Sequence, residues 1–116
     1  MKETEKKLQI ITEACASKKG LDVEVLHVGE LTSIADAFVL VSGTSTTQVG
    51  AIADEVEEKM SEAHFEAFGR EGRSGARWVV LDYGDILVHI FHREEREYYG
   101  LERLWSAPSK GETPWN

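Results

Sequence analysis

The sequence RWVVLDYGDILVHIFH, residues 77–92, predicts two strands joined by a tight turn. Its two runs are dense in β-branched and aromatic residues, a composition typical of strands that are at least half buried. Between them, Gly84 can adopt the positive φ that tight turns need, and Asp82 and Asp85 can bond to nearby backbone. The stretch therefore predicts a β-hairpin that turns at residues 82–85.

The outgoing strand of this hairpin carries two rows of side chains, because side chains alternate between the faces of a strand. An aliphatic row suits a helix-covered core and consists of Ile86, Val88 and Ile90. A mixed row consists of Leu87, His89 and Phe91. A two-residue loop places Trp78 and Val80 beside the mixed row, whereas a three-residue loop with a bulge at Gly84 places Val79 and Leu81 there. The sequence leaves both registers open.

The rest of the chain predicts a single α/β domain over residues 1–106, followed by a flexible tail at 107–116. Its fold class is a mixed five-stranded sheet with helices packed on it. Ser45 and Gln48 fit a capping box at the start of the second helix, and that helix could link the second and third strands in a right-handed crossover. The predicted elements before the hairpin are a helix at 3–19, strands at 21–28 and 37–42, a second helix that opens within 43–48, a short strand at 65–68 and a basic loop at 70–76. A helical turn at 93–99 follows the hairpin.

The charge of the chain is strongly acidic and unevenly spread. There are 13 Lys and Arg against 21 Asp and Glu, a formal net charge of −8, and most of the excess lies in residues 21–69. Direct binding to nucleic acid needs clustered basic residues, so it is not expected. A basic protein is a better partner, because complementary charge steers encounter.

The sequence also predicts where the protein works. Cys15 is the single cysteine, so no internal disulfide can form, and its place on the apolar stripe of the first helix predicts a core residue and not a nucleophile. The start MKETEKKLQ lacks the apolar stretch of a signal peptide, and no apolar run is long enough to span a bilayer. We expect a cytoplasmic protein without a membrane association.

The sequence contains only weak motifs for catalysis. The turn Gly43-Thr44-Ser45 before a helix could hold a phosphate, and Asp82 with Asp85 could hold metal ions, so a nucleotide-binding or nucleotidyl-transferring enzyme is an alternative. The loop lacks the glycines and lysine of a Walker motif, and turn chemistry already explains both aspartates. His89 and His92 are three apart on a strand and should face opposite sides, which disfavours a shared metal. We expect neither enzymatic activity nor a cofactor.

Aromatic residues gather in the last third of the sequence, interleaved with arginines. Tyr, Trp and Arg are the residues that most often anchor protein interfaces. We therefore expect several of them to face a partner. The aromatic residues concerned are Trp78, Tyr83, Phe91, Tyr98, Tyr99 and Trp105.

These features resemble the ribosomal silencing factor family, RsfS, also called the Iojap family. The motifs that carry the resemblance are SGTS at 42–45, LDYGD at 81–85, EERE at 94–97 and LERLW at 101–105, and the likeness runs from the first helix to about residue 105. Ala37 and Arg93 depart from the family, which often has Tyr and Pro there. The resemblance implies a nucleotidyltransferase-like fold without catalysis. It also implies binding to the large ribosomal subunit at universal large-subunit protein fourteen, steric blocking of subunit joining, repression of translation, and a homodimer when free.

On this resemblance, we expect a partner surface built from the mixed strand row, the hairpin turn and the C-terminal segment. An obligate dimer that hides the same row from other partners is a third possibility. The residues expected to bind the partner are Trp78, Asp82, Tyr83, Asp85, Leu87, His89, Phe91, Glu95, Arg96, Tyr98, Tyr99, Leu101, Leu104 and Trp105.

Overall fold

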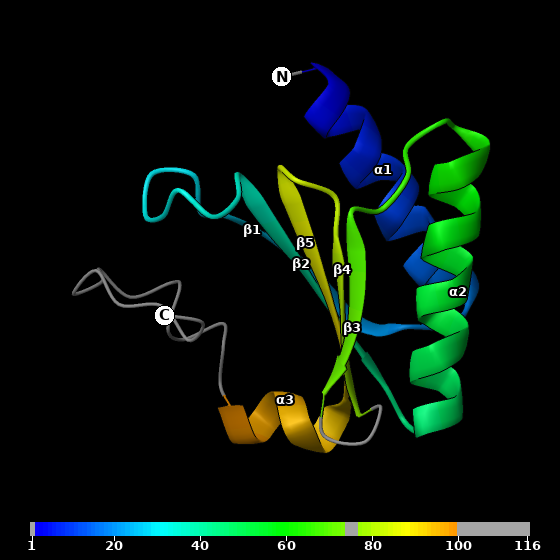
Figure 1. The fold of residues 1–116 in the computed structure, drawn as a ribbon. Helices are drawn as coiled ribbons and strands as arrows, with labels where there is room; N and C mark the ends of the chain where they lie inside the picture. The colour runs from blue at the N-terminus through cyan, green and yellow to red at the C-terminus, as the bar shows by residue number, and fades with distance from the viewer. Residues whose placement is uncertain (1, 74–76, 100–116) are drawn as a thin grey trace.

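The structure is a computed structural model that describes residues 2–73 and 77–99. Helices α1 and α2 cover one face of a five-stranded sheet, and the short helix α3 lies at one end of the other face (Figure 1). The elements are α1 (Lys2–Ser17), β1 (Leu21–His27), β2 (Ala37–Gly43), α2 (Thr46–Glu62), β3 (Gly69–Arg73), β4 (Trp78–Asp82), β5 (Ile86–His92) and α3 (Arg93–Tyr99). The predicted element order and α/β class are confirmed.

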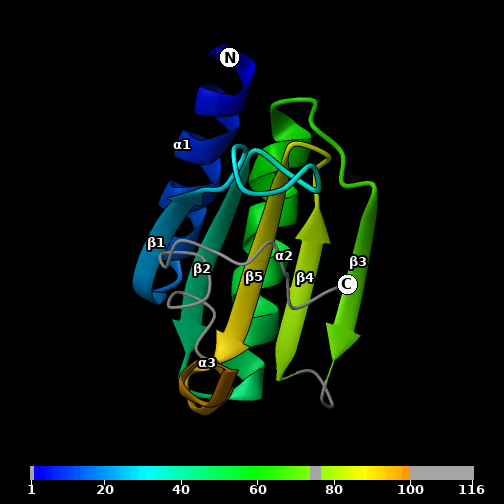
Figure 2. The ribbon, with the colours of Figure 1, turned by 90° about the vertical axis from the view of Figure 1, so that its left-hand side faces the viewer.

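The strands lie in the order β1-β2-β5-β4-β3, as Figure 2 shows face-on. β2 and β5 are parallel, and the other neighbouring pairs are antiparallel, so the sheet is mixed as predicted. Helix α2 links β2 to β3, which run in the same direction but are separated by β5 and β4. β2 is buried along its whole length, because it lies inside the sheet and carries apolar residues on both faces.

The hairpin takes the register of the two-residue loop. Val80 pairs with His89 and Asp82 with Leu87, and the Tyr83 N–H donates to the Ile86 carbonyl at 2.9 Å. The loop residues are therefore Gly84 and Asp85. Gly84 has a φ of 86°, and a positive φ at the first loop residue is the pattern of a type II′ turn.

The helix-covered face holds the main core, and the aliphatic row of β5 lies in it as predicted. Helix α2 contributes its apolar stripe, and α1 contributes Ile11, Ala14 and Cys15. Burying these side chains stabilises the fold, by roughly 1.5–3 kcal/mol for each large one. The buried core residues of α2 are Val49, Ile52, Ala53, Val56 and Met60.

The start of α2 is tied to the end of α1 by one side chain. Ser45 caps α2 by accepting a hydrogen bond from the Gln48 N–H, as predicted. Gln48 does not close the capping box on Ser45. Its Oε1 accepts from the Thr44 N–H at 2.7 Å, and its Nε2 donates to the carbonyls of Lys18 and Lys19. Gln48 therefore satisfies two carbonyl groups of the turn that follows α1.

The predicted third strand was misplaced. We expected a strand at residues 65–68 and a loop at 70–76, whereas β3 spans Gly69–Arg73. Phe65 packs against the helix-covered core, and Phe68 is 80% exposed with its N–H bonded to the Asp82 carbonyl. The strand was missed because backbone pairing with β4 selects it. A charged edge strand such as Arg70-Glu71 shows no hydrophobic alternation.

No helix in the described parts of the chain is long and apolar enough to cross a membrane. The predicted boundary at residue 106 and the predicted tail fall outside those parts.

Candidate functional site

The face of the sheet turned away from α1 and α2 carries a cluster of aromatic rings, which we call the aromatic face. It is formed by Phe38 on β2, Trp78 on β4, and His89 and Phe91 on β5. The ring centroids of Trp78 and Phe91 lie 5.2 Å apart, and those of Phe38 and His89 lie 5.1 Å apart in an edge-on arrangement. These separations fall in the favourable range for aromatic pairs.

A hydrogen bond orients the histidine at the centre of this face. The Nε1–H of Trp78 donates to Nδ1 of His89 at 3.2 Å. Because Nδ1 acts as the acceptor, the ring proton of His89 belongs on Nε2, and the imidazole is neutral in this arrangement. The His89 and Phe91 rings are stacked, with centroids 6.0 Å apart. The hydrogen bond and the stacking therefore hold the rings of Trp78, His89 and Phe91 in one arrangement.

Most of the aromatic side chains on this face are buried and do not reach its surface. Trp78 is 6% exposed, and His89 and Phe91 are exposed by 1% or less. The register places Trp78 on the same face as Leu87, His89 and Phe91, a point that the sequence left open. Their burial assigns most of them to packing, whereas Leu87 and Val80 are half-buried and reach the surface.

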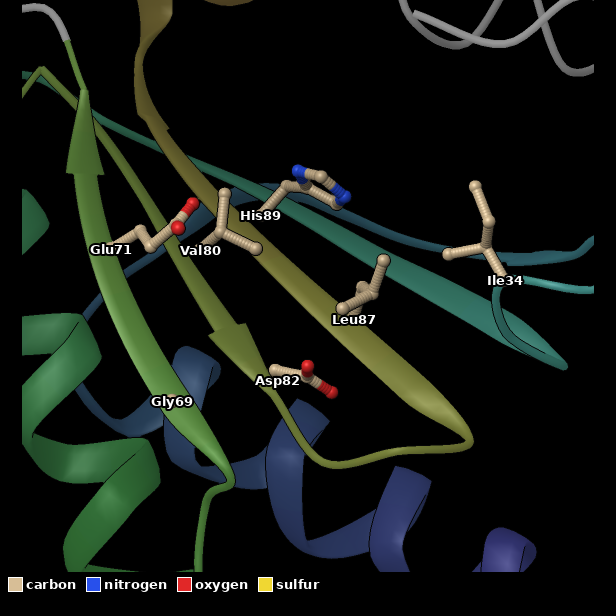
Figure 3. Close-up of a pocket in the computed structure, with 7 residues that line it drawn as sticks. All are labelled: Ile34, Gly69, Glu71, Val80, Asp82, Leu87 and His89. Carbon is tan, nitrogen blue, oxygen red and sulfur yellow. The ribbon is translucent and has the colours of Figure 1, made fainter. Parts of the chain in front are cut away.

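A pocket of about 280 Å³ opens beside these rings (Figure 3). Its base is formed by two rungs that cross three strands. One rung contains Glu71, Val80 and His89, and the other contains Gly69, Asp82 and Leu87. Ile34, from the loop between β1 and β2, closes one side of the pocket. Ile34, Gly69 and Glu71 were not predicted as site residues, because they come from segments far apart in the chain.

The two aspartates of the hairpin have separate roles. Oδ1 of Asp82 accepts a hydrogen bond from the Gly84 N–H at 2.8 Å, and its side chain lines the pocket. Asp85 instead accepts hydrogen bonds from Thr4 at 2.5 Å and from Lys7 at 3.0 Å, which join the turn to α1. The two carboxylates therefore do not converge on a shared metal position.

Asp85 has an altered acidity because of these contacts. Burial alone would raise its pKa, but the hydrogen bonds from Thr4 and Lys7 and the charge of Lys7 outweigh burial and lower the pKa. The ammonium of Lys7 also lies 5.2 Å from the centre of the Phe65 ring. Asp85 thus fastens the hairpin to α1, which its sequence position did not reveal.

The turn Gly43-Thr44-Ser45 is occupied by side chains of its own chain. The Thr44 N–H is bonded to Gln48, and the Gln48 N–H is bonded to Ser45. These are N–H groups that a phosphate would need at the start of α2. The internal bonds weigh against the nucleotide-binding alternative.

Glu95 and Arg96, which we expected to bind a partner, both hold α3 in place. Glu95 pairs with Arg77 at 3.1 Å. Arg96 is buried and donates to the Asp22 carbonyl at 2.7 Å and to the Ser42 hydroxyl at 3.0 Å, and it reaches Glu24 at 3.3 Å. A buried arginine with several acceptors is a fastening point between elements.

Tyr83 lies apart from the aromatic face. It is 2% exposed and belongs to the helix-covered core, because it pairs across the turn with Ile86. Burial, with the nearby charges of Glu57 and Glu66, raises the pKa of Tyr83 to about 12. The other expected contacts, the side chains of Tyr98 and Tyr99 and residues Leu101, Leu104 and Trp105, lie outside the described residues.

His89, His92 and Cys15 do not come together in one site. His89 and His92 lie on opposite faces of β5, as predicted from their spacing. Among the described residues, no group of three His, Cys, Asp or Glu is placed to hold a metal ion. Cys15 is fully buried, and burial raises the pKa of its thiol to about 12, which agrees with a core role.

Comparison with known proteins gives a consistent result. The family model described as "Ribosomal silencing factor during starvation" matches residues 1–115. Ribosomal silencing factor RsfS of Halalkalibacterium halodurans is 43% identical over 103 residues, which are 88% of each protein. A crystal structure of a Chromobacterium violaceum protein superposes with a TM-score of 0.84 at 33% identity, covering 97% of this chain and 98% of that one.

A more distant relative has a name that refers to the large ribosomal subunit. The mouse protein called mitochondrial assembly of ribosomal large subunit protein 1 is 31% identical over 91 residues. The match covers 76% of this chain and 40% of the mouse protein.

Proposed function

This chain belongs to the ribosomal silencing factor family, and from that premise we propose that it binds the large ribosomal subunit and keeps the small subunit from joining. The binding site on the ribosome would be universal large-subunit protein fourteen, on the surface that meets the small subunit. Repression of translation then follows from steric blocking, without turnover or a cofactor. The family match over residues 1–115 is the observation that carries this proposal.

Two further observations support it. The net charge of −8 favours a basic protein surface over nucleic acid as the direct contact. The mouse relative's name links it to the large ribosomal subunit. We place the contact on the aromatic face, where Val80, Asp82 and Leu87 surround the pocket and buried rings hold them in position.

Co-sedimentation with purified ribosomal subunits tests the binding step. We expect the protein to pellet with large subunits and not with small ones, and to pellet less at higher salt, because screening weakens charge-driven contacts. Binding to neither subunit, or to the small subunit alone, would contradict the proposal.

A reassociation assay tests the blocking step. Large subunits are incubated with the protein before small subunits are added, and joined ribosomes are measured on a sucrose gradient. We expect fewer joined ribosomes as the protein concentration rises. Adding the protein after joining is the order-of-addition control, and it should have less effect. Normal joining with a fully occupied large subunit would rule out steric blocking.

We also propose that the free protein forms a homodimer, as the family resemblance implies. Analytical ultracentrifugation at micromolar concentration measures this directly. A dimer that dissociates when large subunits are added is consistent with binding through one shared face. A dimer that stays intact and excludes subunits would instead favour an obligate dimer.

A further inference from the structure

The pocket on the aromatic face has the shape and charge to receive one side chain from a partner. We propose that it takes a lysine or arginine side chain of the protein to which this chain binds. This inference rests on the proposed function and specifies the chemistry of its contact.

The shape of the pocket comes from a missing side chain. The rung that crosses β3, β4 and β5 contains Gly69, Asp82 and Leu87, and Gly69 leaves its position on β3 empty. A Cβ built at Gly69 would meet no atom within 4 Å. Gly69 therefore leaves room for a partner's side chain beside Asp82 (Figure 3).

The charge of the pocket favours a cation. Asp82, a half-buried residue whose side chain lines the pocket, supplies the carboxylate that would meet a cation. His89 adds no positive charge, because its Nδ1 accepts the Trp78 N–H and the ring is neutral. Oδ1 of Asp82 is used by the Gly84 N–H, and a carboxylate can accept further hydrogen bonds.

The rest of the lining suits the aliphatic stem of a long basic side chain. Leu87 lies next to Asp82 on one rung, Val80 lies next to Glu71 on the other, and Ile34 adds apolar surface beyond them. Lysine and arginine bury such stems against apolar surface and keep their charged ends near polar groups. The volume of about 280 Å³ lies near the lower end of the range of about 300–1,000 Å³ typical of small-molecule sites, which gives enough room for one long side chain.

A neutralising substitution tests the charge. In Asp82→Asn the amide oxygen can still accept the Gly84 N–H, so the turn is kept while the negative charge is lost. Glu58→Gln is the matched control, because Glu58 is an exposed residue of α2 on the other side of the sheet. We expect Asp82→Asn to weaken binding to purified large subunits about tenfold, the loss typical of a charge-assisted hydrogen bond, and Glu58→Gln to leave binding unchanged.

A steric substitution tests the shape without changing charge. Gly69→Val adds a side chain that fills the free space beside Asp82 and suits a strand. Gly72→Val is its control on the same strand. Gly72 pairs with Val79, whose side chain lies in the helix-covered core, so the added side chain points to the opposite face, where there is also room. We expect Gly69→Val alone to weaken binding, with thermal unfolding of both variants close to the wild type.

The outcomes separate this inference from the proposed function. If the wild-type protein does not bind large subunits, both the proposed function and the inference about the pocket are wrong. If the wild type binds and both Asp82→Asn and Gly69→Val bind equally well, the function stands and the pocket is not the contact. Equal weakening by Asp82→Asn and Glu58→Gln would point to the general acidic field, and it would also overturn the inference.

Discussion

The indole N–H of Trp78 donates to Nδ1 of His89, and this bond links β4 to β5 within the aromatic face. Both side chains are buried, so water cannot replace either partner freely. A buried polar atom that loses its partner costs more than the bond itself contributes. The pair therefore helps to keep the base of the proposed binding face in one arrangement.

A double-mutant cycle measures this bond. Trp78→Phe removes the donor, and His89→Phe removes the acceptor while keeping a ring in place. We expect each single variant to unfold at lower urea concentration, and a coupling of about 1 kcal/mol between the two sites. A coupling near zero would mean that the two rings contribute by packing alone.

Sequence patterns predicted the elements that are defined by local chemistry. The hairpin followed from Gly84 between two β-branched runs, and α2 followed from its cap at Ser45 and its apolar stripe. The strand β3 was missed, because Gly69–Arg73 shows no hydrophobic alternation and is fixed by pairing with β4. Local patterns identify buried strands more readily than charged edge strands.

The site was harder to predict than the fold, because its parts are joined by tertiary structure. Ile34 and Gly69 carry no sequence signal that associates them with Asp82, yet all three line one pocket. Arg96 was expected to face a partner and is instead buried against β1 and β2. Charge alone does not distinguish an arginine that binds a partner from one that fastens a helix.

Asp85 should make part of the stability dependent on pH. Its pKa is lowered in the folded protein, so its contribution is present above the unfolded value of about 3.9 and is lost as the pH falls through the folded value. We expect Asp85→Asn to lower the free energy of unfolding by about 0.5–1 kcal/mol at neutral pH, because it removes the pairing with Lys7.

The comparison is made by urea unfolding of the wild type and Asp85→Asn across acidic and neutral pH. The two curves should converge at low pH, where the wild-type carboxyl is also protonated. A difference that stays constant with pH would assign the effect to the hydrogen bond with Thr4 and not to the charge.

Arg96 should control whether α3 stays attached to the sheet. Arg96→Leu removes the bonds to Asp22 and Ser42, and we expect a loss of about 2 kcal/mol in stability. Arg93→Leu is the matched control, because Arg93 is an exposed residue of the same helix and should change stability by less than about 0.5 kcal/mol. Hydrogen exchange of the α3 amides gives a local readout, and equal protection in both variants would show that Arg96 does not hold the helix.

Cys15 should report on opening of the helix-covered core. Its side chain, which extends from α1, is fully buried in that core, and burial raises the pKa of the thiol to about 12. The reactive thiolate is therefore scarce, and the sulfur is inaccessible while the core is closed. We expect an alkylating reagent at about pH 8 to label the native protein very slowly and the urea-unfolded protein rapidly, since an unperturbed thiol has a pKa of about 8.5.

Adding Val56→Ala, which leaves a cavity in the same core, should speed native-state labelling because the core then opens more often. Rapid labelling of the native wild type would contradict a closed core around Cys15.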